Sequence, residues 1–170
     1  MAGSPHLSNL RALRLSGNRI TNAGAIALAE SQTLSGDIRE LDISGNMIHR
    51  DGMRAVAQSP IFAKVESLDI GYNALPDDQV ADMLSELRHL RSLQELHCKL
   101  TSIDGERVAP LANSPEFASL KILDLEVNLL RQGGAAVLAQ SKYLRPHALN
   151  IGVNLIGPDD MRTILHAPIC

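Results

Sequence analysis

Asp69, His97 and Asp124 are the residues whose types and spacing most suggest reactive chemistry in this sequence. They are separated by 28 and 27 residues, and each sits inside a short apolar run. Imidazole and carboxylate groups together serve general acid–base catalysis and also bind metal ions. If the two intervals are turns of one repeating structure, the three side chains lie at one level on neighbouring strands.

Two observations argue against catalysis by this cluster. The same row offers no Ser or Cys nucleophile, and strand alternation turns Cys98 to the opposite face. A catalytic or metal site also needs an enclosed pocket with supporting groups, whereas the face of a curved sheet is open to water. We therefore predict no catalytic residue, no metal ion and no cofactor, and we expect that the protein is not an enzyme.

Other motifs that could bind ligands have structural explanations. The acidic pairs in residues 76–78 and 158–160 each follow a proline, which is typical of the first turn of a helix. Gly133-Gly134 also opens a predicted helix, but it lacks the Lys-Ser/Thr and the glycine spacing of a phosphate-binding loop.

Composition narrows the class of protein. The chain has 170 residues, 45% hydrophobic and 21% charged, with a net charge of −3. These values exclude a strongly basic nucleic-acid-binding surface and intrinsic disorder. No apolar run is long enough for a membrane span, and the first residues do not resemble a signal peptide. With only two cysteines, we expect a cytoplasmic protein, or one secreted into a host cell without a cleavable signal.

Six copies of one pattern dominate the sequence. Each copy fits L-x-x-L-x-L-x-x-N-x-L, and successive copies begin 26 to 28 residues apart. They are LRALRLSGNRI (10–20), IRELDISGNMI (38–48), VESLDIGYNAL (65–75), LQELHCKLTSI (93–103), LKILDLEVNLL (120–130) and PHALNIGVNLI (146–156). Alternating apolar residues predict a short strand with one buried face. The Asn amide can bond backbone groups where the chain leaves the strand, so we expect an Asn ladder, weakest at Thr101.

The second part of each copy has helical periodicity. Apolar residues recur at i, i+3 and i+4 in all six copies, as at Met53, Val56 and Ala57. Pro110 falls inside the fourth of these patterns and should shorten or kink that helix. Because helices are wider than the strand spacing, the stack must curve with its strands on the concave side.

These repeats resemble the ribonuclease-inhibitor-like class of leucine-rich-repeat proteins. Their consensus sequence, with Ser-Pro before the helix-to-strand connection, is similar to that of repeat arrays in bacterial proteins, including effectors. The resemblance implies an α/β fold: one right-handed solenoid domain over residues 1–170, with a short parallel sheet inside and helices outside. It also implies a protein-binding horseshoe, with no nucleic acid or membrane as partner.

The concave surface is the predicted binding site. It presents the residue between the two inner leucines of each strand, the residue two positions later, and one aromatic side chain. The candidates are Arg14, Asp42, Asp69, Tyr72, His97, Lys99, Asp124 and Glu126. We expect Tyr72, His97 and Lys99 at the centre of an interface, because aromatic residues are enriched among interface hot spots. The alternative is that each Asp is simply the consensus residue of the repeat at a solvent-exposed position. In that case binding would use the convex helices or the loops.

The leading hypothesis for the function is a non-catalytic protein-interaction module of a bacterial effector or regulatory protein. One alternative is a self-assembling element, because residues 4–7 and 167–169 look like partial repeats that leave both ends uncapped. Another is the recognition subunit of a larger enzyme whose catalytic domain is absent from this sequence. We also predict that Cys98 and Cys170 are not bonded to each other, since two repeat layers separate them.

Overall fold

The computed structural model describes residues 7–34, 36–73 and 76–166, which form a curved array of strand–helix units. Strands are β1 (Ala12–Arg14), β2 (Glu40–Asp42), β3 (Ser67–Asp69), β4 (Glu95–His97), β5 (Ile122–Asp124) and β6 (Ala148–Asn150). The α-helices are α1 (Asn22–Ala29), α2 (Arg50–Gln58), α3 (Val80–Glu86), α4 (Ala109–Asn113), α5 (Arg131–Ala139) and α6 (Pro158–Leu165). Short 3-10 helices are η2 (Pro60–Phe62), η3 (Asp77–Gln79), η4 (Leu87–His89) and η5 (Pro115–Phe117).

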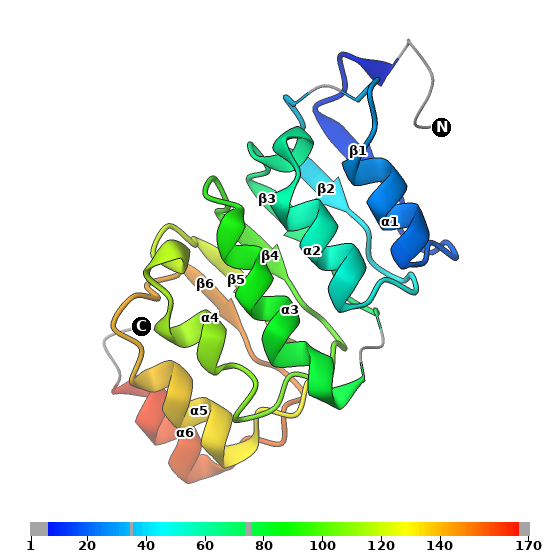
Figure 1. Cartoon of the computed structure of the whole chain (residues 1–170). Coiled ribbons are helices and arrows are strands. Elements are labelled where there is room, and N and C mark those ends of the chain that lie inside the picture. Colours follow the sequence, from blue (N-terminus) through cyan, green and yellow to red (C-terminus); the bar gives the residue numbers. More distant parts are fainter. Residues whose placement is uncertain (1–6, 35, 74–75, 167–170) are drawn as a thin grey trace.

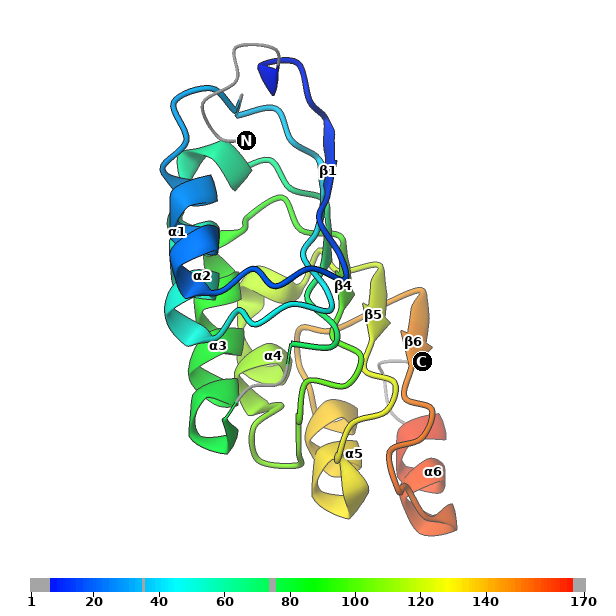
Figure 2. The same cartoon turned by 90° about the vertical axis from the view of Figure 1, so that its right-hand side faces the viewer.

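The strands form a parallel sheet in the order β1-β2-β3-β4-β5-β6. The register is the same at every step: Leu41 pairs with Leu68, Leu68 with Leu96, and Leu96 with Leu123. Helices cover one side of the sheet and leave the other side open (Figures 1 and 2). The predicted α/β leucine-rich-repeat architecture is therefore confirmed.

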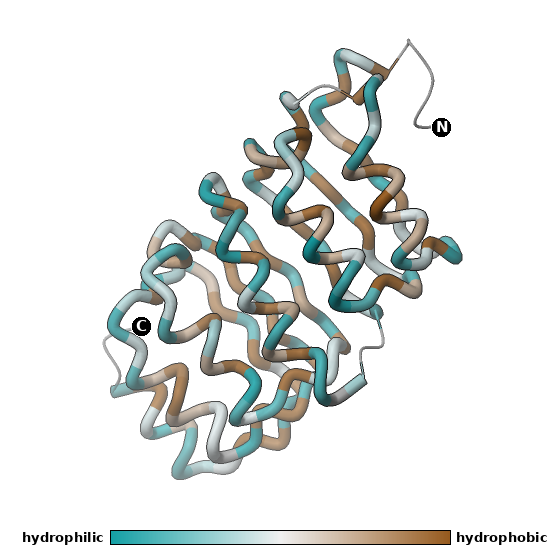
Figure 3. The backbone as a smooth tube through the Cα atoms, viewed as in Figure 1, coloured by the Kyte–Doolittle hydropathy of each residue, from teal (hydrophilic) through white to brown (hydrophobic). Residues whose placement is uncertain are grey.

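The core lies between the sheet and the helices. The inward leucines of β2 to β5 are at most 1% exposed, and they meet buried helix residues such as Met53, Met83 and Leu111. Both phenylalanines, Phe62 and Phe117, are buried in the 3-10 turns that follow Ser-Pro. Figure 3 shows hydrophobic residues recurring unit by unit along the backbone. This spacing buries one apolar layer per unit, which is how a repeat array builds a continuous core.

The predicted Asn ladder is present. Asn128 Nδ2 donates to the carbonyl of Leu125 in its own unit (3.0 Å) and to that of Cys98 in the previous unit (2.8 Å). Its Oδ1 accepts from the backbone of Thr101 and Ile103. The side chain of Thr101 has only one donor, its hydroxyl, which lies 2.8 Å from the carbonyl of Cys98 in its own unit and 3.4 Å from Asn128 Oδ1. The fourth unit is thus the weak rung, because a hydroxyl cannot donate in two directions at once.

Two helices differ from the regular pattern. The fourth, α4, has 5 residues, whereas α2 and α5 have 9. Pro110 lies in the first turn of α4, where its missing N–H is tolerated, so the predicted shortening is confirmed. In α6, Met161 and Leu165 are 39% and 66% exposed. These two side chains are exposed because no further unit among the described residues packs on that side.

Cys98 is a free, fully buried cysteine, as expected from its inward strand position. Burial raises the pKa of its thiol well above the usual value, and the nearby carboxylates of Asp69 and Asp124 raise it further. Cys170 lies outside the described residues. Within the described ranges, no helix is both long and apolar enough to cross a membrane.

Candidate functional site

The concave face carries the predicted row of side chains at one level. Strand register places Arg14 beside Asp42, Asp42 beside Asp69, Asp69 beside His97, and His97 beside Asp124. Except for Arg14, which is exposed, these side chains are partly buried. The sequence pattern therefore located this row correctly, because parallel pairing in constant register brings equivalent repeat positions together.

Each aspartate of the row also supports its own turn. Asp69 accepts a hydrogen bond from the backbone N–H of Gly71 (2.8 Å), and Asp124 accepts one from Glu126 (2.9 Å). Asp42 accepts from both the N–H (3.0 Å) and the hydroxyl (2.6 Å) of Ser44. The carboxylates thus satisfy backbone donors where the strands end. This favours the interpretation that Asp is a structural residue of the repeat, with its other oxygen left facing the concave solvent.

Arg14 has a partner that the sequence analysis missed. Its guanidinium binds both carboxylate oxygens of Glu40, at 2.5 and 2.8 Å, and this contact raises the pKa of Arg14. Glu40 belongs to a second concave row at the first position of each strand, which also includes Ser67 and Glu95. The same alternation that identified the Arg14 row could have found this one, two residues earlier. Arg14 is therefore charge-compensated rather than an open cation.

The Asp69–His97–Asp124 cluster is looser than an acid–base site requires. His97 Nδ1 is 3.9 Å from a carboxylate oxygen of Asp124, which is too far for a hydrogen bond. Burial raises the pKa of Asp69, against the opposing effects of the Gly71 N–H and His97. The adjoining cavity, lined by Glu40, Asp42, Asp69 and His97 among others, holds only about 170 Å³. Among the described residues, no group of three His, Cys, Asp or Glu side chains could hold a metal ion.

Tyr72, Lys99 and Glu126 form a second polar group on this face. Lys99 Nζ is 2.6 Å from Glu126, and the hydrogen bond to this carboxylate raises the pKa of Lys99, with a smaller contribution from Tyr72. The side chain of Tyr72 is 50% exposed. These three predicted residues lie in the turns that follow β3, β4 and β5, and the structure brings them together.

A row of apolar residues at the ends of the strands, exposed at Tyr72, Leu100 and Val153 and partly buried at Val127, was missed by the sequence analysis. It follows the strands directly and contains Tyr72, Leu100, Val127 and Val153, all at φ between 51° and 55°. In the first two units the same position is Gly17 or Gly45, also at positive φ. The signal was present in the sequence: the residue before the Asn slot changes from glycine to a large apolar residue after the second copy.

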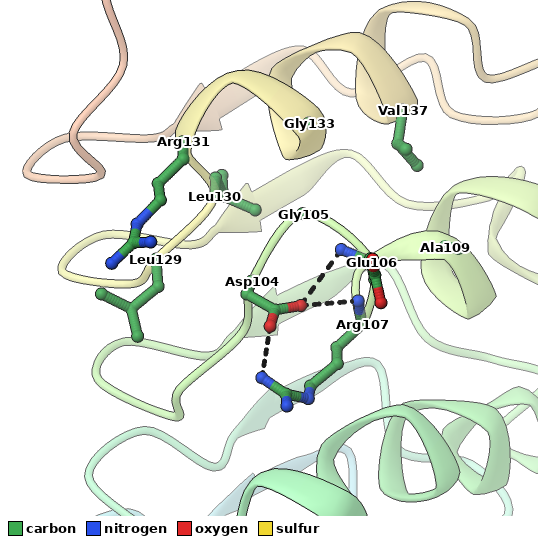
Figure 4. Close-up of a pocket in the computed structure, with 10 residues that line it drawn as sticks. All are labelled: Asp104, Gly105, Glu106, Arg107, Ala109, Leu129, Leu130, Arg131, Gly133 and Val137. Carbon is green, nitrogen blue, oxygen red and sulfur yellow. Dashed lines mark hydrogen bonds and ion pairs between the residues drawn. The ribbon is translucent and has the colours of Figure 1, made fainter.

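A cavity of about 610 Å³ opens where the first turn of α4 is missing (Figure 4). One wall is the loop before α4, which the Asp104 carboxylate stabilises by accepting from the N–H groups of Glu106 and Arg107 and by pairing with the Arg107 side chain. The other wall is the start of α5, including Gly133, with Leu129 beside it. The α4 loop approaches closely here, since a Cβ on Gly105 would lie 2.7 Å from the nitrogen of Gly134. The glycines thus serve close packing between units.

Comparison with known proteins agrees with the repeat geometry. The family described as "Leucine Rich repeat" matches residues 6–29 and 37–57. The chain has a leucine-rich-repeat fold. An internalin from Listeria monocytogenes has a similar structure, with a TM-score of 0.58 and 22% identity over 94% of this chain. The C-terminal domain of tropomodulin from Caenorhabditis elegans is also similar, with a TM-score of 0.52 and 12% identity over 93% of this chain.

Both structural similarities concern the fold alone. The chain spans 39% of the internalin chain and 81% of the tropomodulin domain. No curated protein sequence matches it.

Proposed function

We propose that this chain is a non-catalytic protein-binding module that receives its partner on the concave face. The centre of the binding surface is Tyr72, His97 and Lys99, supported by the carboxylates of Asp69, Asp124 and Glu126. Arg14 and Asp42 extend it toward the first units. The observation that carries the proposal is the grouping of Tyr72, Lys99 and Glu126 in the turns that follow three consecutive strands of an open sheet.

The shape and charge of this face favour a protein over a small molecule. Ligand sites for small molecules enclose most of the ligand, whereas the concave cavity at Asp69 and His97 is small and open. Groups of both signs lie along the arc, with Arg14 followed by the carboxylates of Asp42 and Asp69 and then by Lys99 beside Glu126. Charges of both signs impose a matching pattern on the partner, which raises specificity and association rate more than affinity.

The host protein in this proposal is a bacterial effector or regulator. The support is the consensus sequence of the repeats, which resembles that of bacterial arrays. It places Ser59-Pro60 and Ser114-Pro115 ahead of buried phenylalanines. Affinity purification from bacterial and host-cell lysates, followed by mass spectrometry, would identify the partner. Reproducible recovery of one protein from the bacterial or the host-cell lysate supports a function in that cell. If no protein is recovered from either lysate, the result counts against a protein-binding function.

Two substitutions test the binding surface once the partner is known. Tyr72→Ala removes the exposed aromatic ring, and Lys99→Glu places a second negative charge beside Glu126. We expect each to weaken the partner's affinity by about tenfold or more, the scale of a hot spot, without lowering the melting temperature. Tyr143→Ala is the matched control, because Tyr143 is an exposed aromatic on the loop after α5. Unchanged affinity in both concave variants would place the interface elsewhere.

Self-association is the second candidate function, and the exposed end of the array favours it. Val153, Leu155 and Leu165 of the sixth unit are 66–70% exposed, more than any other large apolar residue described. Light scattering over a concentration series tests this candidate. A mass that rises with concentration supports it, and a constant monomer mass at high concentration rejects it.

A further inference from the structure

We propose that the apolar row at the ends of the strands is the main contact line for a protein segment that carries apolar side chains flanked by lysine or arginine. We call this row the turn ridge and define it as Tyr72, Leu100, Val127 and Val153. The inference rests on the proposed function and deepens it, because it names the anchoring residues and the chemistry of the partner.

Backbone hydrogen bonds make the turn ridge one continuous line. The N–H of Tyr72 donates to Lys99 (2.7 Å), that of Leu100 to Glu126 (3.2 Å), and that of Val127 to Gly152 (2.9 Å). Each bond joins a ridge residue to the turn of the next unit. The four side chains are therefore spaced along the array with the period of the strands, about 4.8 Å.

Every residue of the turn ridge has an unfavourable backbone conformation. Their φ angles of 51° to 55° lie in the left-handed region, which is costly for residues with a Cβ and most unusual for β-branched residues such as Val127 and Val153. Gly17 and Gly45 show that the turn itself needs only glycine. In four units the chain therefore accepts strain where glycine would relieve it.

Packing within the chain does not explain these apolar residues. Tyr72 is 50% exposed, Leu100 47% and Val153 70%. Two residues beyond the ridge positions, Leu129 and Leu155 add apolar surface that is 41% and 70% exposed. Strain combined with exposed apolar side chains is typical of a functional surface, and a row of this kind marks an interaction site.

The charged residues next to the turn ridge indicate the charge that a partner segment should carry. Arg14 and Lys99 are each paired with a glutamate, so the cations of this face are compensated. Within the described residues, no ion pair with lysine or arginine is formed by Asp69 or Glu95, and Asp42 has only the longer-range attraction of Arg14, whose guanidinium binds Glu40. The partly buried Asp69 would be stabilised as a carboxylate by a cation from outside. A segment that places apolar side chains on the ridge and basic ones over this acidic row complements both features.

Melting temperature tests the strain without any partner. Val153→Gly relieves the left-handed backbone at a side chain that is mostly exposed. We expect the melting temperature to rise by about 2 °C, because relief of strain outweighs the added freedom of the unfolded chain. Val153→Thr keeps the β-branch and the strain, so it should leave the melting temperature unchanged. A lower melting temperature in Val153→Gly would mean that the residue stabilises the fold, and would overturn the argument.

A peptide-display experiment tests the partner chemistry. A random dodecapeptide library is selected on the immobilised full chain, and enriched peptides are synthesised. We expect apolar residues together with Lys or Arg, and at least about tenfold weaker binding to Leu100→Gly, Val153→Gly and Asp69→Asn. Tyr143→Ala serves as the control and should bind normally. Enrichment of acidic peptides, no enrichment, or equal loss in the control would overturn the proposal.

The variants separate this inference from the proposed function. If the lysate partner is lost by Lys99→Glu and retained by Leu100→Gly and Val153→Gly, the ridge is wrong and the concave-face module stands. Tyr72 belongs to both surfaces, so Lys99→Glu alone represents the concave site in this comparison. If Leu100→Gly and Val153→Gly lose the partner while Lys99→Glu retains it, binding is centred on the ridge and the concave proposal fails. Loss in both sets supports a single surface that includes the ridge.

Discussion

At the scale of single residues, each unit depends on a few polar side chains that satisfy backbone groups. The Asn of the repeat bonds its own unit and the one before it, and the Asp of the strand bonds the N–H two residues later. These hydrogen bonds contribute strongly to the free energy of unfolding, because a backbone group that is shielded from water and left unpaired destabilises the folded state.

Substitution of two asparagines tests the ladder. Asn128→Ala leaves the buried carbonyls of Cys98 and Leu125 and the N–H of Ile103 without this partner. We expect it to lower the free energy of unfolding by about 2–4 kcal/mol. Asn18→Ala is the control: Asn18 is exposed and bonds only Leu15 and Ser16 of its own unit, so about 1 kcal/mol or less is expected. Urea unfolding measures both, and equal losses would contradict a ladder between units.

The raised pKa of Asp69 predicts a pH-dependent stability. A carboxyl whose pKa is higher in the folded state than in the unfolded state destabilises the fold above that pKa, and the penalty disappears as the pH falls below the unfolded value, 3.8. We expect Asp69→Asn to raise stability at pH 7 by less than about 1 kcal/mol, since water screens part of the surface. The amide can still accept from Gly71, as Asn150 does from Gly152.

The comparison of urea midpoints at pH 7 and pH 3 checks this prediction. The gain from Asp69→Asn should be present at pH 7 and absent at pH 3. Asp159→Asn, at an exposed carboxylate of α6, is the control and should change neither midpoint. A gain of the same size at both pH values would show that the charge of Asp69 is not its cause.

At the scale of elements, the fourth unit is the irregular one. Pro110 shortens α4, the loop before it is held by Asp104, and a cavity opens against α5. Close contact between this loop and α5 depends on glycine, because the two backbones meet where side chains would otherwise lie.

Two glycine substitutions test this contact. Gly105→Ala would place a Cβ 2.7 Å from the backbone nitrogen of Gly134, so the units must separate. We expect a loss of about 1–3 kcal/mol, the usual cost of overpacking. Gly133→Ala meets nothing closer than 3.7 Å and lies in α5, where alanine is the better helix former. It should be neutral or stabilising by up to about 1 kcal/mol. Similar losses in thermal or urea unfolding would show that the close approach is not limiting.

At the scale of the whole molecule, the array is stabilised by contacts between neighbouring units. Helices and strands pack on their neighbours in chain order, and within the described residues β1 and β6 each have one paired edge. The strand residues of β3 are more buried than those of β6. Local opening should therefore be easiest at the two ends.

Hydrogen exchange of the native chain measures this gradient. We expect the amides of Ile70 and Cys98, which follow β3 and β4, to exchange at least about tenfold more slowly than that of Gly152, which follows β6. The first two amides donate to the backbone of the next unit, whereas Gly152 donates only to Asn150. Uniform protection along the sheet would mean that the array opens as one cooperative unit.

The fold, and the row of side chains on the concave face, could both be predicted from the repeat pattern. Repetition fixes which residues face inward, because a strand alternates and a parallel sheet in constant register aligns equivalent positions. Asp69, His97 and Asp124 could be placed side by side on that basis, and Pro110 could be assigned its effect on α4.

The partners of charged side chains and the backbone conformation of the turn residues become visible only in the three-dimensional structure. Side chains select partners by distance, so Arg14 pairs with Glu40 on the neighbouring strand, and His97 stays 3.9 Å from Asp124. Periodicity carries no information on the sign of φ once glycine is replaced, so the strain at Leu100, Val127 and Val153 could not be predicted. The loop–helix contact at Gly105 likewise depends on how closely two units stack, which pairs residues that no repeat pattern relates.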